Sequence, residues 1–202
     1  MSASGTNILL AGVGGQGVVL ASKILARCAA ARGEQARTSE TIGMAQRGGS
    51  VTSHVRLGEC ARAPLIPRGG ADVIIGFEPA ETARSLGFLK PGGAVIVSDR
   101  GVYPSGGDEY DPEEILGFLR AYGGISALVV VSADAVRRAA GSYKPLNVAL
   151  LGAAAGRLGI SEEEAVAALR GIVSSRLAEA NLEAWRAGAA AGEKYTRKEM
   201  GI

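Results

Sequence analysis

The chain has 202 residues, of which 47% are hydrophobic and 21% are charged. This composition excludes an intrinsically disordered chain, which needs low hydrophobicity and a large net charge. The 22 lysine and arginine residues against 20 aspartate and glutamate residues give a formal charge of +2, too small for nucleic acid to be the main partner. We expect one folded domain over residues 1–202.

Residues 1–22 carry no charged side chain, but five glycines interrupt this stretch and no basic residue precedes its apolar part. It therefore fits neither a membrane span nor a secretion signal. We expect no membrane partner and a location in the cytoplasm. The apolar run over residues 7–12 is instead predicted to be a buried strand that leads into a helix.

Apolar periodicity predicts alternating strands and helices along the first 131 residues, which is typical of an α/β fold with a mostly parallel sheet and helices on both faces. From about residue 133 the pattern predicts a helical C-terminal portion. The expected strands cover 7–12, 35–38, 51–57, 71–77, 94–98 and 127–131, with a loop over 41–49 and a turn over 90–93. The expected helices cover 15–31, 79–89, a segment that opens at Asp111, 133–140, 145–158, 161–170 and a last one from about 174.

A glycine-rich motif follows the first expected strand. Residues 12–17 read G-V-G-G-Q-G, which satisfies G-x-G-x-x-G at the opening of a helix, the context of a dinucleotide or phosphate loop. The alternative is that these glycines serve only tight helix packing or a protein interface. A dinucleotide site also needs an acidic residue near the end of the second strand, for which Glu34 and Glu40 are the candidates.

A second unusual segment precedes the third expected strand. Arg47-Gly48-Gly49-Ser50 places a guanidinium beside a stretch of backbone donors, which suits a phosphate or carboxylate. The alternative is a plain turn with a surface arginine.

Cysteine and histidine usage limits the metal chemistry of the chain. Cys28 and Cys60 form no C-x-x-C pair, so this chain alone can build neither an iron–sulfur cluster nor a structural zinc site. We expect both thiols to be reduced, with a disulfide between them as the alternative. His54 is the single histidine and is expected to be a half-buried structural residue, while Trp185 is expected in the core or an interface. No metal site is predicted.

Taken together, the two motifs resemble the gamma-type subunit of 2-oxoacid:ferredoxin oxidoreductases. The resemblance rests on residues 12–25, on S-E-T at 39–41 and on G-M-A-Q-R-G-G-S-V at 43–51. The M-A-Q-R-G-G-S form is most similar to the beta subunit of indolepyruvate:ferredoxin oxidoreductase. Lys144-Pro145-Leu146-Asn147 followed by Leu151-Gly152 is also similar to the family, so the resemblance covers most of the chain.

The resemblance implies a subunit of an enzyme that oxidatively decarboxylates a 2-oxoacid, preferably an aryl pyruvate such as indolepyruvate, to an acyl-CoA and passes electrons to ferredoxin. It implies that a larger partner subunit carries thiamine diphosphate and [4Fe-4S] clusters, that coenzyme A is a co-substrate, and that this chain binds no cofactor and has no activity alone.

Site residues follow from the same resemblance. The loop glycines shape a backbone turn, Gln16 hydrogen-bonds across it, Arg47 is the catalytic candidate, and Asn147 ties a later helix to this surface. The residues expected to face the ligand or the partner are Gly12, Gly14, Gly15, Gln16, Gly17, Arg47, Gly48, Gly49, Ser50 and Asn147.

Two other functions stay open at this point: a free-standing NAD(P)-dependent oxidoreductase that uses the first glycine loop, and a non-enzymatic interaction module. The low aromatic content and the Ala/Gly-rich surfaces also predict that the isolated chain self-associates, as a homodimer.

Overall fold

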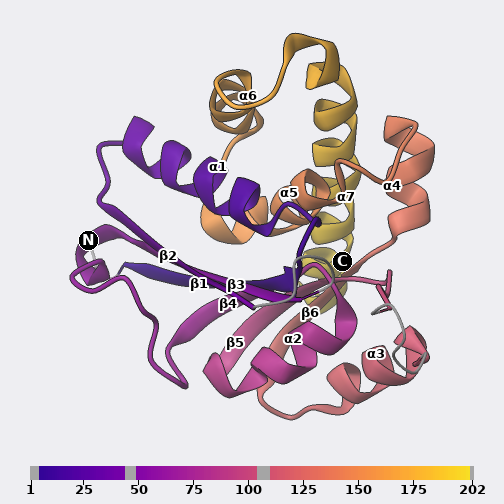
Figure 1. The fold of residues 1–202 in the computed structure, drawn as a ribbon. Coiled ribbons are helices and arrows are strands. Elements are labelled where there is room, and N and C mark those ends of the chain that lie inside the picture. Colours follow the sequence, from indigo (N-terminus) through magenta and orange to yellow (C-terminus); the bar gives the residue numbers. More distant parts are fainter. Residues whose placement is uncertain (1–4, 44–48, 104–109, 201–202) are drawn as a thin grey trace.

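A six-stranded sheet in the order β2-β3-β1-β4-β5-β6 forms the middle layer of the molecule (Figure 1). The computed structural model describes the backbone of residues 5–43, 49–103 and 110–200, and their side chains apart from those of Cys60 and 195–200. The strands are β1 Thr6–Val13, β2 Ala36–Ile42, β3 Ser50–Leu57, β4 Ala71–Gly76, β5 Leu89–Ser98 and β6 Ile125–Val131.

Four neighbouring strands, β1, β4, β5 and β6, run parallel, with Leu9 beside Ile74 and Ile74 beside Val95. β3 is antiparallel to both of its neighbours, β1 and β2. The predicted α/β class with a mostly parallel sheet is therefore confirmed. The antiparallel β3 is inserted between β2 and β1, a feature that the sequence pattern did not reveal.

Helices cover both faces of this sheet (Figure 1). α2 (Pro79–Ser85) and α3 (Pro112–Ala121) lie on one face. α1 (Val18–Ala31) and α5 (Leu146–Leu158) lie on the other, with α4 (Ala133–Ala140), α6 (Glu162–Arg170) and α7 (Ala178–Met200) around them. The helical C-terminal portion is thus confirmed. None of the helices in the described part of the chain is long and apolar enough to cross a membrane.

Alternating side chains of the strands fill two cores, one on each face of the sheet. Ile8, Leu10 and Ile75 face α1 and α5 and are fully buried. Leu9, Ile74 and Val95 face α2 and α3 and are fully buried as well. Burial on both faces explains why these strands read as continuous apolar runs.

Local signals fix several helix starts. Asp111 accepts a hydrogen bond from Glu113 N at the start of α3. Ser161 and Glu164 form a capping box at the start of α6. These side chains satisfy backbone N–H groups that a first helical turn leaves unpaired.

Some predicted boundaries are wrong. The predicted turn over 90–93 belongs to β5, whose start is irregular because Gly92 has a φ of 74° and the register against β6 shifts at Gly93. The helix predicted to reach residue 89 ends at Ser85, and a 3-10 turn over Leu86–Phe88 follows it. The second strand is longer than predicted and takes in the first residues of the expected 41–49 loop, up to Ile42. The last helix begins at Ala178, after a 3-10 turn.

The Ala/Gly-rich part of α7 packs inside the chain. A β-carbon on Gly188 would lie 1.8 Å from the carbonyl oxygen of Ala149, and one on Gly152 would lie 2.2 Å from that of Trp185. The small residues therefore allow α5 and α7 to approach closely within one molecule, which removes them as a reason to expect self-association.

Candidate functional site

A cavity of about 350 Å³ opens at the carboxyl ends of the parallel strands. Open α/β sheets bind ligands at this edge, where loops follow the strands and helices begin. The wall is built from the loop after β1, the residue after β4, the segment after β5 and the start of α5. The lining residues are Val13, Gly14, Gly15, Gln16, Phe77, Arg100, Val102, Tyr143, Lys144, Leu146 and Asn147.

The glycine loop brings the start of α1 against the start of α5. Gly17 has a left-handed φ of 81° and precedes the first residue of α1. A β-carbon at this position would lie 2.5 Å from Asn147 Nδ2, so only glycine fits. Asn147 is buried, and its Oδ1 accepts a hydrogen bond from Val148 N.

Gln16 ties this loop to the end of β4. Its Oε1 accepts a hydrogen bond from Val13 N at 2.8 Å, and its Nε2 donates one to the carbonyl oxygen of Phe77 at 2.9 Å. Both polar atoms of the side chain thus have backbone partners across the loop. Gln16 therefore shapes the cavity wall.

The second motif meets the first through its C-terminal end. Gly14 N donates to the carbonyl oxygen of Gly49 at 2.9 Å. Ser50 does not line the cavity, and its hydroxyl donates a hydrogen bond to Oε2 of the buried Glu81 at 2.6 Å. Arg47 and Gly48 lie outside the described residues.

The structure thus brings Gly14, Gly15, Gln16 and Asn147 together around one cavity. Gly12 and Gly17 support the loop from behind, since a β-carbon on Gly12 would meet both Gln16 Oε1 and Phe77 Cβ at 2.7 Å.

Arg100 and Tyr143 are among the lining residues that sequence reasoning missed. Arg100 follows β5 at the carboxyl edge, so its place directly after a predicted buried strand was a usable signal. Its guanidinium carbon lies 4.2 Å from the centre of the Tyr143 ring. No local pattern pairs two residues that are so far apart in the sequence.

The cavity is positively charged. Arg100 and Lys144 line it, and none of the acidic residues that the structure describes does. Neither side chain takes part in an ion pair with another of the described residues, and both are exposed. Two unneutralised cations beside a glycine loop favour a phosphate or carboxylate ligand.

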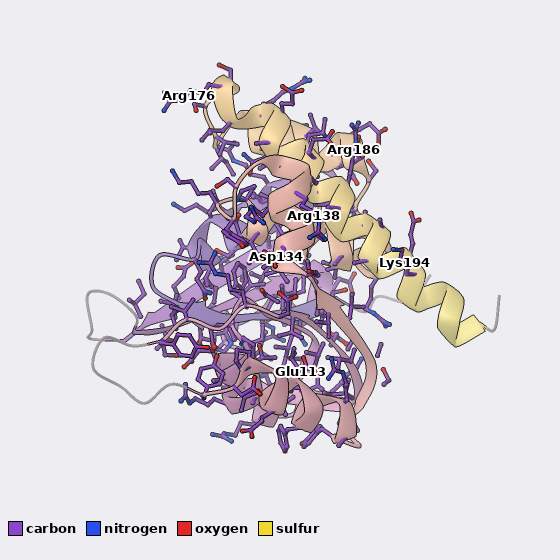
Figure 2. The ribbon with its side chains drawn as sticks, turned by 90° about the vertical axis from the view of Figure 1, so that its right-hand side faces the viewer. Glu113, Asp134, Arg138, Arg176, Arg186 and Lys194 are labelled. Carbon is purple, nitrogen blue, oxygen red and sulfur yellow. The ribbon has the colours of Figure 1, made fainter. Side chains whose placement is uncertain are left out.

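A second cavity of about 500 Å³ adjoins the first and shares Arg100 and Tyr143 with it. Its other charged lining residues are acidic: Asp99, Asp111, Glu113 and Asp134. Figure 2 shows Asp134 on α4 and, below it, Glu113 on α3. Anions are therefore repelled from this side and attracted to the side of Lys144.

Glu78 is a buried carboxyl beside the cavity wall, directly after Phe77. Its Oε2 accepts a hydrogen bond from Glu81 N and so caps α2. Burial raises the pKa of Glu78, and the nearby Glu81 carboxylate raises it further, while backbone N–H groups, among them that of Val102, oppose the rise. Two buried acidic residues therefore brace the start of α2 next to both motifs.

Other side chains that the sequence singled out lie away from the cavity. His54 is 5% exposed, its Nδ1 accepts a hydrogen bond from Ile66 N, and burial lowers its pKa. It is structural, as predicted, but buried where half-burial was expected. Trp185 is buried in the core, which confirms that prediction. Cys28 is a buried free thiol with a raised pKa, chiefly because of burial.

The acid expected of a dinucleotide site is not beside the glycine loop. Glu40 is on β2, and β3 separates β2 from β1. Its Oε1 accepts a hydrogen bond from Ser22 Oγ at 3.1 Å. In a dinucleotide fold the second strand lies beside the first, so that its terminal acid reaches the ribose. This sheet order weighs against nicotinamide dinucleotide binding.

Comparisons with known proteins agree with this arrangement. The family model described as pyruvate ferredoxin/flavodoxin oxidoreductase matches residues 7–191. The indolepyruvate oxidoreductase subunit IorB of Archaeoglobus fulgidus is 41% identical over an alignment of 189 residues, which covers 90% of this chain and 92% of that one.

Two solved structures share the fold. The gamma subunit of a keto/oxoacid ferredoxin oxidoreductase from Geobacter sulfurreducens is 23% identical, with a TM-score of 0.72 over 96% of this chain and 99% of that one. A 2-oxoglutarate:ferredoxin oxidoreductase from Magnetococcus marinus, described with 2-oxoglutarate, coenzyme A and succinyl-CoA bound, is 25% identical, with a TM-score of 0.72 over 96% of this chain and 32% of that one.

Proposed function

The chain belongs to the pyruvate ferredoxin/flavodoxin oxidoreductase family, and from this premise we propose that it is the small subunit of a 2-oxoacid:ferredoxin oxidoreductase. Within that class we propose indolepyruvate or a related aryl pyruvate as the substrate. The 41% identical relative is named an indolepyruvate oxidoreductase subunit, and its alignment with this chain covers nearly its whole length. The product is the corresponding acyl-CoA, and the complex works in the cytoplasm with ferredoxin as electron acceptor.

The observation that carries the proposal is the basic cavity at the carboxyl edge of the sheet. Arg100, Lys144 and the loop backbone can hold the phosphate groups of coenzyme A. Asn147 Nδ2 lies at the same wall, and no hydrogen bond to another described residue uses it. This chain thus binds and orients the acyl acceptor.

We assign the redox chemistry to a larger partner subunit. Thiamine diphosphate supplies the carbanion chemistry of 2-oxoacid decarboxylation when it is bound, and [4Fe-4S] clusters remove electrons singly. A [4Fe-4S] cluster takes four cysteine thiolates, and this chain has two cysteines, of which Cys28 is buried beside the carbonyl oxygen of Glu164. The isolated chain is therefore expected to be inactive.

We propose that Arg47, Gly48 and Gly49 belong to the same site, because Gly49 contacts the first loop. Gly49 meets the first loop at Gly14, and β3 begins at the next residue, Ser50. We propose that Arg47 contacts the ligand or the partner subunit there.

The test is to tag the chain in its native host, isolate the proteins that copurify with it, and measure indolepyruvate- and CoA-dependent reduction of a viologen dye. A partner that contains thiamine and iron–sulfur clusters, together with CoA-dependent activity, is expected. Activity with pyruvate or 2-oxoglutarate but not indolepyruvate would correct the substrate.

The second candidate is a free-standing NAD(P)-dependent oxidoreductase, favoured only by the G-x-G-x-x-G motif at 12–17. Calorimetric titration of the isolated chain with NADH and NADPH distinguishes the two. Micromolar binding without any partner would replace the subunit proposal.

A further inference from the structure

We propose that Tyr143 is a positioning residue, which holds the guanidinium of Arg100 at the cavity so that Arg100 binds a phosphate group of coenzyme A. The inference rests on the proposed function. It adds that Arg100 is the side chain that binds the phosphate and that Tyr143 is the residue that orients Arg100.

The Tyr143 ring is a fixed platform. Its hydroxyl donates a hydrogen bond to Asp134 Oδ1 at 2.5 Å. This bond is the largest of the interactions that lower the pKa of Asp134, so the acceptor is a carboxylate near neutral pH. Arg137, which also pairs with Asp134, approaches the same ring at 5.5 Å. The start of α4 thus holds the ring in place.

Arg100 stacks on this platform. Its guanidinium carbon is 4.2 Å from the ring centre, well inside the range of a cation–π contact. A guanidinium stacked on an aromatic ring keeps its N–H groups at its own edge, where they can form paired hydrogen bonds to phosphate. The stack therefore presents Arg100 as an oriented donor.

The backbone below Arg100 is fixed as well. Arg100 N donates to Ser98 Oγ at 3.0 Å, and Asp99 N donates to the carbonyl oxygen of Val131 at 3.1 Å. Asp99 Oδ1 accepts a hydrogen bond from Ala133 N at 2.8 Å. Only the long side chain of Arg100 remains to be oriented, and Tyr143 orients it.

Electrostatics indicate which side the phosphate takes. Asp134 is already engaged by Tyr143 and Arg137 and does not pair with Arg100. The neighbouring acidic cavity repels an anion, whereas Lys144 next to Tyr143 attracts one. The phosphate is therefore expected between Arg100 and Lys144.

The test uses the assembled complex with five variants: Arg100→Ala, Tyr143→Leu, Tyr143→Phe, the double variant Arg100→Ala/Tyr143→Leu, and Arg138→Ala. Arg138 is the matched control, because it is an exposed arginine on α4 that does not line the cavity (Figure 2). The measurements are kcat, the KM for CoA, the KM for indolepyruvate, and the KM for pantetheine, which carries no phosphate.

We expect Arg100→Ala and Tyr143→Leu each to raise the KM for CoA about tenfold, with kcat and both other KM values unchanged. Tyr143→Phe keeps the stack and loses the hydrogen bond, so an intermediate rise is expected. The double variant should match Arg100→Ala, because Tyr143 acts only through Arg100. The control should match the wild type.

Two outcomes would overturn the proposal. One is that the effects of Arg100→Ala and Tyr143→Leu multiply in the double variant. The other is that Tyr143→Leu raises the KM for pantetheine as much as that for CoA. A wild-type complex without CoA-dependent turnover would instead reject the proposed function, so the two failures are distinguishable.

Discussion

Gly17 and Asn147, which are 130 positions apart in the sequence, lie in contact beside the cavity, where a β-carbon on Gly17 would lie 2.5 Å from Asn147 Nδ2. Through this contact the glycine loop and the first turn of α5 fix each other's position. The glycine motif at 12–17 and the segment that contains Asn147 are therefore parts of one structure.

Replacement of Gly17 by alanine tests this contact. The left-handed φ of 81° costs an alanine about 1 kcal/mol, and the collision with Asn147 adds to that cost. Gly15→Ala is the matched control, because Gly15 has a φ of 94° but nothing within 4 Å of its added carbon. Urea unfolding should show Gly17→Ala to be the less stable variant. When Asn147→Ala is added to both variants, the difference between their free energies of unfolding should become smaller. Equal stabilities of Gly17→Ala and Gly15→Ala would contradict the close contact.

Arg47→Ala tests the second motif. We expect turnover of the assembled complex to fall about tenfold or more while the subunit folds and assembles normally, because the change removes a charged donor from a surface segment. Steady-state kinetics with CoA and 2-oxoacid measure the turnover, circular dichroism measures the folding, and gel filtration measures the assembly. Unchanged kinetics would remove Arg47 from the site.

Gly188→Ala tests the close packing of α5 and α7. The added carbon would lie 1.8 Å from the carbonyl oxygen of Ala149, so the helices must separate, at a cost of about 2 kcal/mol or more. Gly156→Ala in α5 has open space around it and should stabilise the protein by about 0.5–1 kcal/mol. The two urea midpoints should therefore move in opposite directions from that of the wild type.

Glu164 makes stability depend on acid pH. The Arg32 guanidinium, together with the backbone N–H of Ser161, lowers the pKa of Glu164 from 4.5 to about 2. Because folding lowers the pKa of Glu164, its carboxylate stabilises the folded protein fully at pH values above the pKa of the unfolded chain. This stabilisation is lost as the pH falls from about 4.5 towards 2. Glu164→Gln should flatten the decline of the urea midpoint in this range, whereas the exposed Glu193→Gln should leave it unchanged. The same decline in Glu164→Gln and wild type would reject the assignment.

The apolar runs predicted the strands and most helices because the residues that an element buries follow one another in a pattern that is visible in the local sequence. Residues 71–77 are an example: five of the six residues of β4 are buried, so the strand is evident without its neighbours. The direction and place of β3 are different. They depend on pairing with β1 over the whole register from Thr6 opposite Leu57 to Val13 opposite Ser50, which no local pattern encodes.

The candidate site divides in the same way. Gly14, Gly15 and Gln16 were found because a short motif contains them, and Asn147 was found by family resemblance. Arg100 and Tyr143 were missed because their role in the site depends on a contact between the segment after β5 and the connector before α5. Long-range contacts of this kind depend on the packing of the whole sheet.

The place of β2 has a consequence for how the molecule opens. Within the described part of the chain β2 pairs only with β3, and most of its residues are exposed, whereas β4 is paired on both sides and buried. Local opening should therefore release the amide protons of β2 to solvent at a much lower free energy than those of β4. β2 can thus exchange its amide protons, and adjust its fit to a partner subunit, while β4 stays closed.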